Sequence, residues 1–142
     1  MARSRALRRF LRVLELEEEQ HRARMASALA DLHHLEELLT AAEDRERAGR
    51  QLMNESAQTG KVVDRLAGRE ESQLARKRAA LLKPQIADAE EAARAQRKSF
   101  LEKRIERRQT ETVIVKSESA DAIEAGRRAQ RSLDDWFLRR VR

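Results

Sequence analysis

The strongest constraint on this fold is a seven-residue repeat of apolar side chains in the first third of the chain. Steps of alternately four and three residues from Leu7 reach fourteen positions, of which ten are Leu, Met or Ala. The full series is Leu7, Leu11, Leu14, Glu18, His21, Met25, Ala28, Leu32, Leu35, Leu39, Ala42, Glu46, Gly49 and Met53. A mean spacing of about 3.5 residues is typical of a coiled-coil helix and does not fit a strand. The repeat therefore predicts a helix over residues 4–56.

A cluster of turn-forming residues follows this repeat. Asn54, Ser56, Thr59 and Gly60 lie close together, and no other part of the chain has comparable turn chemistry. Gly60 is suited to the left-handed backbone conformation that ends many helices. The sequence predicts one bend, over residues 57–61.

A second helix is predicted over residues 62–140, with a less regular apolar pattern. Its expected seam is Val62/Val63, Leu66, Leu74, Leu81/Leu82, Ile86, Ala89, Ala93, Phe100, Leu101, Ile105 and Thr112/Val113. Pro84 removes one backbone hydrogen bond at a cost of about 3 kcal/mol, so we expect a kink near Pro84. The pattern weakens beyond Glu111, which predicts a weaker helix around residues 116–119.

The predicted fold is all-α: two long helices in an antiparallel coiled-coil hairpin, forming a single domain over residues 1–142. Charged residues make up 39% of the chain and aromatic residues only 3%, which argues against a thick core. The pairing places Leu39 near Leu81 and Leu14 near Ile105, and uses up the first helix near residue 114. The final segment, 116–142, then projects without a partner by up to about 40 Å.

Several classes of function are excluded or disfavoured by the residues present. There is no cysteine and no apolar run of about 20 residues, and the basic segment 1–12 lacks the apolar stretch of a secretory signal. We therefore expect a cytoplasmic protein without membrane insertion. No phosphate-binding loop or nucleophile motif occurs, and a two-helix hairpin offers no catalytic cleft, so neither an enzyme nor a cofactor is expected. His33 and His34 diverge by about 100° on a helix and do not form a metal site, whereas His21 in the seam suits a register-setting role.

The two ends of the hairpin supply the candidate binding residues. These are Arg5, Arg8, Arg9 and Arg12 at one end, and Leu133, Trp136, Phe137, Arg139 and Arg140 at the other. A hairpin brings its ends to one pole, where arginines surrounding an apolar tip would dock onto an acidic protein surface. Solvated helix ends are the alternative, and nucleic-acid binding is disfavoured because no stacking aromatics or DNA-binding motif are present. The aromatic pair either forms an interface, which we favour, or folds back onto the hairpin.

Three segments resemble the flagellar FliJ family and its injectisome counterparts, the YscO-type proteins. They are the opening Phe10-Leu11-Arg12-Val13-Leu14-Glu15-Leu16-Glu17-Glu18-Glu19-Gln20, the bend Ser56 to Gly60, and the ending Arg131-Ser132-Leu133-Asp134-Asp135-Trp136-Phe137-Leu138-Arg139-Arg140. The resemblance covers nearly the whole chain through diffuse motifs.

The resemblance implies a non-enzymatic stalk subunit of a type III export apparatus. Its open end would enter the ring of the hexameric export ATPase, and the stalk would link that ring to the export gate protein and bind export chaperones. It would be cytoplasmic and peripheral at the inner-membrane face. The Asp-Asp-Trp-Phe ending leans towards the injectisome rather than the flagellum. A generic coiled-coil scaffold or adaptor is the alternative from a different class.

Overall fold

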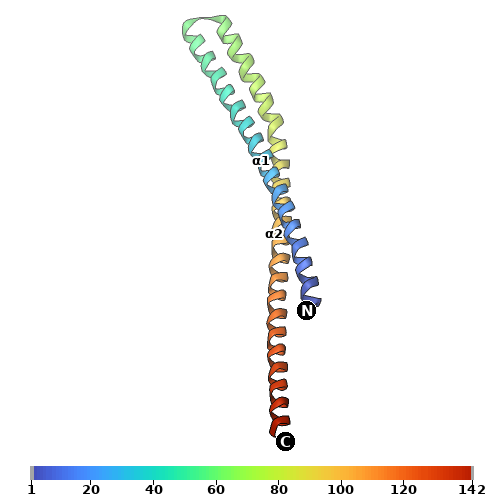
Figure 1. Ribbon diagram of the computed structural model, residues 1–142. Helices are drawn as coiled ribbons and strands as arrows, with labels where there is room; N and C mark the ends of the chain where they lie inside the picture. Colours follow the sequence, from blue (N-terminus) through green and yellow to red (C-terminus); the bar gives the residue numbers. More distant parts are fainter. Residues whose placement is uncertain (1, 142) are drawn as a thin grey trace. The chain divides into compact units, whose positions relative to one another are not determined.

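The computed structural model describes residues 2–141, and its two helices form a hairpin (Figure 1). Helix α1 spans Ala2–Thr59 and helix α2 spans Val62–Val141. The two helices pack against each other, and no strand occurs within residues 2–141. The all-α hairpin with a longer second helix is therefore confirmed. The predicted bounds differ slightly, since α1 begins two residues before position 4 and α2 ends one residue after position 140; positions 1 and 142 lie outside the described residues.

The bend is a two-residue connection closed by Gly60. Its φ angle of 75° is in the left-handed region that favours glycine, as the sequence predicts. The Gly60 N–H donates to the Ser56 carbonyl at 2.7 Å, and the Arg65 N–H donates to the Lys61 carbonyl at 3.2 Å. The bend is shorter than the predicted 57–61 because residues 57–59 continue α1, where the Thr59 hydroxyl donates to the Glu55 carbonyl at 3.2 Å.

The chain divides into two compact units. The terminal unit comprises residues 1–21 and 99–142, and the bend unit comprises Arg22–Lys98. In each unit a stretch of α1 lies against a stretch of α2.

The seam of α1 is the predicted one. All fourteen positions of the repeat from Leu7 to Met53 are buried or half-buried, and the same steps continue to Ser4 and Ser56. Leu14 and Ala42 are among the most buried apolar side chains. The heptad repeat was therefore sufficient to identify the face of α1 that packs on α2.

The seam of α2 matches the predicted one at Leu82, Ile86, Ala89, Ala93 and Phe100. Elsewhere the prediction, which followed the large apolar side chains, is wrong. Leu66, Leu74, Leu81 and Ile105 are 60%, 50%, 68% and 55% exposed. From Ser72 the observed seam steps by three and four through Ser72, Ala75, Ala79, Leu82, Ile86, Ala89, Ala93, Gln96, Phe100, Lys103, Arg107, Thr110, Ile114 and Ser117. Small side chains occupy much of this face because they let two helices approach closely, whereas large side chains are displaced to the outer face.

Helix α2 is continuous through the two points where weakness was expected. Pro84 lies on the exposed face, between seam residues Leu82 and Ile86, and Ala80, whose carbonyl loses its helical N–H partner at Pro84, is exposed as well. The kink itself remains a prediction. The helix also continues across residues 116–119, contrary to the expected weakening, because Ser117 and Glu118 are half-buried against α1 and Ser4 donates to Glu118 at 3.2 Å.

Candidate docking surface

The bend unit holds its helices together through close contact of backbone. A Cβ atom added to Gly49 would lie 2.7 Å from the Gly68 carbonyl oxygen, and one added to Gly68 would lie 2.6 Å from the Gly49 carbonyl oxygen. Buried Ser72 and Ala75 continue this narrow contact. Gly49, an exception in the apolar repeat, is therefore required by the approach of α2.

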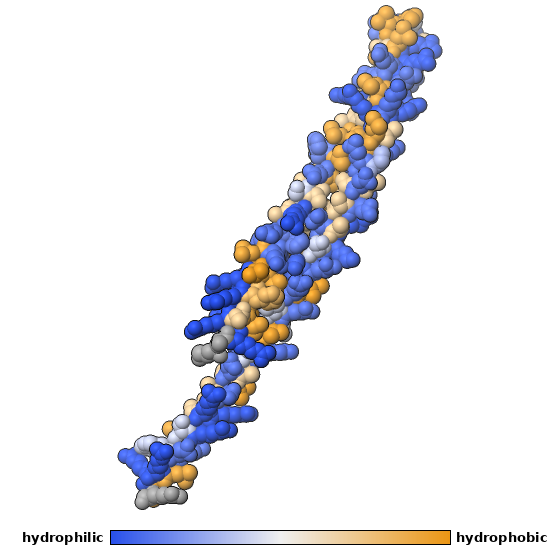
Figure 2. Space-filling model, turned by 90° about the vertical axis from the view of Figure 1, so that its right-hand side faces the viewer, coloured by the Kyte–Doolittle hydropathy of each residue, from blue (hydrophilic) through white to orange (hydrophobic). Residues whose placement is uncertain are grey.

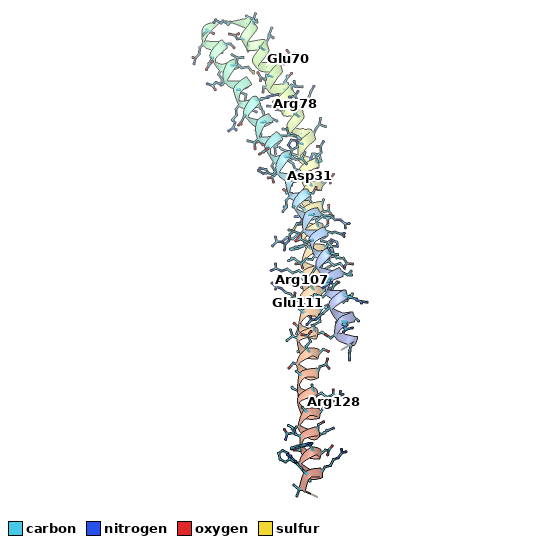
Figure 3. The ribbon with its side chains drawn as sticks, in the orientation of Figure 1. Asp31, Glu70, Arg78, Arg107, Glu111 and Arg128 are labelled. Carbon is cyan, nitrogen blue, oxygen red and sulfur yellow. The ribbon has the colours of Figure 1, made fainter. Side chains whose placement is uncertain are left out.

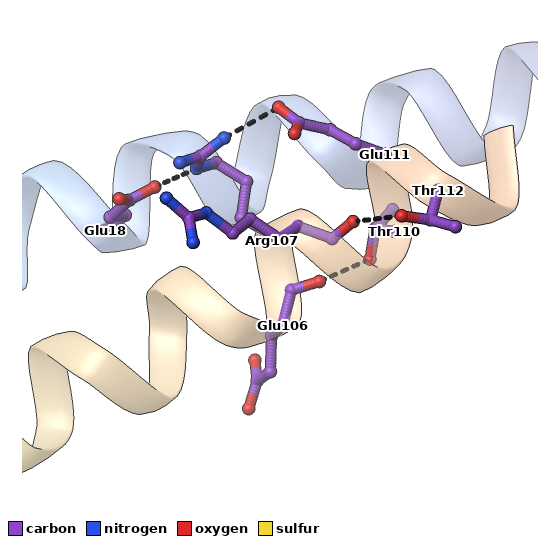
Figure 4. A network of polar contacts seen from close by, with 7 residues as sticks. Glu18, Glu106, Arg107, Thr110, Glu111 and Thr112 are labelled. Atoms are coloured by element: carbon purple, nitrogen blue, oxygen red, sulfur yellow. Dashed lines mark hydrogen bonds and ion pairs between the residues drawn. The ribbon is translucent and has the colours of Figure 1, made fainter. Parts of the chain in front are cut away.

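The terminal unit uses charged side chains at the equivalent seam positions. Glu18 of α1 is only 6% exposed and is paired with Arg107 of α2, which also donates to Glu111 at 2.7 Å (Figure 4). The hydrogen bond to Glu18, followed by that to Glu111, raises the pKa of Arg107. The guanidinium therefore bridges a carboxylate from each helix.

A lysine makes a second bridge between the helices of the terminal unit. Lys103 Nζ lies 3.0 Å from a Glu17 oxygen on α1 and 3.3 Å from a Glu106 oxygen on α2. These hydrogen bonds, that to Glu17 first, raise the pKa of Lys103. Sequence reasoning missed both bridges because it assigned the α2 seam to the apolar Leu101 and Ile105. Glu18 within the α1 repeat was the available clue.

The N-terminal arginines do not act alike. Arg8 binds Glu118 of α2, with its Nε donating at 2.9 Å, and this hydrogen bond lowers the pKa of Glu118. Arg5 and Arg8 line a shallow groove with Glu118 and Ala122. Arg9 and Arg12 are exposed. Of the predicted binding residues at this end, Arg8 thus has a structural partner within the chain.

The segment of α2 beyond its contact with α1 is the most exposed helical part of the terminal unit. Every residue from Ser119 to Val141, which we call the tail, is exposed. Arg107 and Glu111 lie beside α1, whereas Arg128 lies on the part of α2 beyond the start of α1 (Figure 3). The predicted unpartnered segment is therefore present, and it begins near residue 119 rather than at 116 because α1 still contacts Glu118.

The aromatic residues of the tail remain on its surface. Leu133, Trp136 and Phe137 are 53%, 49% and 60% exposed, and apolar atoms reach the surface near the C-terminal end (Figure 2). Trp136 and Phe137 meet edge to face with ring centres 5.3 Å apart, and the Arg140 guanidinium lies 4.6 Å from the Trp136 ring centre. The tail does not fold back onto the hairpin. Arg139 is exposed beside them.

The two groups of candidate residues do not form one basic pole. Glu118, beside Arg8, and Trp136 are eighteen residues apart on a continuous helix, which is about 27 Å. The expected single pole is wrong because α2 continues far beyond the first turn of α1. The terminal unit instead offers an arginine-rich start of α1 and a separate tail.

The histidines, possible metal sites and possible membrane spans were the remaining features to check in residues 2–141. Residues 2–141 contain no group of three or more side chains placed to hold a metal ion. His21 lies in the seam, where its Nδ1 is buried and makes no hydrogen bond within that range, and His33 lies 3.1 Å from Glu37. No helix within the described residues is long and apolar enough to cross a membrane.

Comparison with known proteins yields no relative: no family model, curated protein or solved structure matches this chain.

Proposed function

We propose that this chain is a non-enzymatic stalk or adaptor subunit of a bacterial type III secretion export apparatus. Its open end docks into the hexameric export ATPase, and the stalk connects the ATPase with the export gate protein and export chaperones. The proposal rests on the resemblance of residues 10–20, 56–60 and 131–140 to FliJ and YscO-type proteins. It also places the protein in the cytoplasm, peripheral at the inner-membrane face, with the injectisome favoured over the flagellum.

The observation that carries the proposal is the exposed, helical tail. A helix that leaves Leu133, Trp136 and Phe137 in water presents aromatic anchors, which commonly dominate the energy of protein interfaces. Arg139 and Arg140 beside them favour an acidic partner surface and accelerate encounter with it. A helix of this kind suits insertion into a ring-shaped partner.

The test is binding to purified hexameric export ATPase, with stimulation of ATP hydrolysis as a second readout. Trp136→Ala/Phe137→Ala should weaken both at least tenfold. The matched control is Val62→Ala/Val63→Ala, which removes similarly exposed side chains (67% and 79%) at the bend. Wild-type chain that neither binds nor stimulates an injectisome or a flagellar export ATPase would refute the proposal.

A coiled-coil scaffold is the alternative, favoured by the many exposed apolar residues of α2. It predicts binding partners unrelated to secretion and no effect on ATP hydrolysis. Nucleic-acid binding predicts affinity that falls steeply with salt.

A further inference from the structure

The tail has one face without charged residues, on the side of α2 opposite the continued α1-facing seam. At the α1 end of this face, Val115 and Ala122 also line shallow grooves beside Leu11 and Arg5 of α1. Steps of four and three residues from Val115 reach Ser119, Ala122, Gly126, Ala129, Leu133 and Trp136, which we call the outer stripe. The α1-facing seam, continued from Ser117, would instead reach Asp121, Glu124, Arg128, Arg131 and Asp135. The two series are two residues apart, about 200° around the helix. The tail is therefore built to pack on something other than an extension of α1.

The composition of the outer stripe favours a second helix over a lipid surface. Four consecutive positions, Ser119 to Ala129, are small, and a Cβ added to Gly126 would meet nothing within 4 Å. Small residues contribute little to lipid burial but allow helices to approach closely. The bend unit of this chain packs in that way, through Gly49, Gly68, Ser72 and Ala75.

The order of sizes along the stripe suits a second copy of the same tail. In an antiparallel pair with its two-fold axis between Gly126 and Ala129, Leu133 lies opposite the partner copy's Ala122 position. Trp136 then lies opposite the position of Ser119. Each large side chain meets a small one, which lets the layers interdigitate, and the contact is self-complementary as a two-fold interface requires.

Charge also permits this pairing. Residues 119–141 contain five arginines and four acidic residues, so two tails do not strongly repel each other. In the antiparallel register, Arg139 of one copy flanks Glu118 of the other, giving an opposite-charge pair at each end of the contact. Glu118 keeps 38% of its side chain exposed while bound to Arg8, so it is accessible to a second guanidinium.

We propose that two copies of the chain pair antiparallel through the outer stripes of their tails. The contact spans residues 115–140, about 37 Å of helix. It leaves the seam between α1 and α2 intact. One consequence rests on the proposed function: the pairing covers Leu133 and Trp136, so a paired tail is not available to the export ATPase.

The first test measures mass by sedimentation over a concentration series. Wild type should pass from monomer to dimer, Leu133→Asp should stay monomeric, and the matched control Leu138→Asp should dimerise like wild type. Both leucines are exposed, at 53% and 66%, and Leu138 lies off the outer stripe. Trp136, the single tryptophan, should shift its emission to the blue as wild type dimerises. A wild type that remains monomeric, or two variants that behave alike, would overturn the proposal.

The second test determines orientation by disulfide formation, since the chain has no cysteine of its own. A mixture of Ala122→Cys and Leu133→Cys should form the mixed disulfide. Ala122→Cys alone should not, because the equivalent position of the other copy lies about 16 Å away along the helix, beyond disulfide range. Rapid cross-linking of Ala122→Cys alone would indicate a parallel pair and overturn the antiparallel register.

Binding of the monomeric chain to phosphatidylglycerol vesicles through its tail would point to a lipid occupant and also overturn the pairing proposal. If either test fails, the chain should still bind the export ATPase. Failure of the tail-pairing proposal can therefore be distinguished from failure of the proposed function.

Discussion

The bend unit and the terminal unit are built from the same two helices but hold them together by different means. In the bend unit the contact passes through Gly49, Gly68 and Ala75, where backbone meets backbone. In the terminal unit Glu18 and Arg107 occupy the seam. Close packing is sensitive to volume and insensitive to solution conditions, whereas ion pairs respond to pH and salt. The bend unit also has an ion pair across its helices, between Arg76 and Glu46. The terminal unit has Arg107 with Glu18, Lys103 with Glu17 and Arg8 with Glu118, so its helix pairing should depend more on solution conditions.

The largest expected effect comes from adding volume to the bend unit. Gly68→Val places a branched side chain where even a Cβ would lie 2.6 Å from the Gly49 carbonyl, so the helices must separate. We expect a loss of about 1–3 kcal/mol in the free energy of unfolding, measured by denaturant titration. Gly126→Val, on the open tail, is the matched control and should change the stability of the dilute chain by less than about 0.5 kcal/mol. Equal effects at both glycines would contradict the close-packing description.

Removing one member of the buried ion pair should have the next largest effect, and it should be confined to the terminal unit. Glu18→Ala leaves Arg107 with Glu111 alone and should cost about 2 kcal/mol, the usual range for a hydrogen bond to a charged group. Amide exchange should accelerate in residues 100–118 and not in residues 68–82. Glu18→Leu/Arg107→Leu should recover most of the loss, because an apolar pair of similar volume needs no desolvation of charge. If the double variant does not recover the lost free energy of unfolding, the Arg107 guanidinium contributes more to stability than an apolar side chain packed at the same seam position.

The difference between the two units also explains which parts of this structure can be predicted from the sequence. The α1 seam and the Gly60 bend follow from local pattern, because a long heptad repeat and a left-handed glycine are each specified by their own residues. The α2 seam does not, since the choice between Leu74 and Ala75 depends on how closely α1 approaches. The polar bridges at Lys103 and Arg107 depend on the register between the helices. The large apolar residues of α2 indicated a different seam, so the sequence did not reveal these bridges. The exposed tail was predictable from helix lengths alone, although the separation of its tip from the N-terminal arginines required the position of Glu118.

A change of pH should loosen the terminal unit at both extremes. The Arg8 hydrogen bond lowers the pKa of Glu118 from 4.5, so its contribution to stability is present above pH 4.5 and is lost as pH falls through the lower, folded value. The pKa of Lys103 is raised from 10.5, so its contribution is present below pH 10.5 and is lost as pH rises through the folded value. Amide exchange in residues 100–118, corrected for its intrinsic pH dependence, should rise several-fold at pH 3 relative to pH 7. Gly49, Gly68 and Ala75 do not titrate, and the ion pair between Arg76 and Glu46 is the bend-unit counterpart to set against the several pairs of the terminal unit. An equal rise around the bend-unit seam would therefore remove the distinction between the units.

The smallest effect separates two neighbouring arginines of α1. Arg8→Gln removes the charged partner of Glu118 and leaves the hydrogen bond from Ser4, whereas Arg9→Gln removes the same charge from an exposed face. Because the Arg8 side chain is 64% exposed, its ion pair is screened, and Arg8→Gln should raise amide exchange in residues 114–118 by less than about fivefold. Arg9→Gln should leave it unchanged, and the difference between the variants should vanish in about 1 M salt, where charges more than about 3 Å apart are screened. If the difference persists in high salt, the start of α1 is held by packing of the Arg8 side chain rather than by its charge. The terminal unit would then resemble the bend unit more closely than its ion pairs suggest.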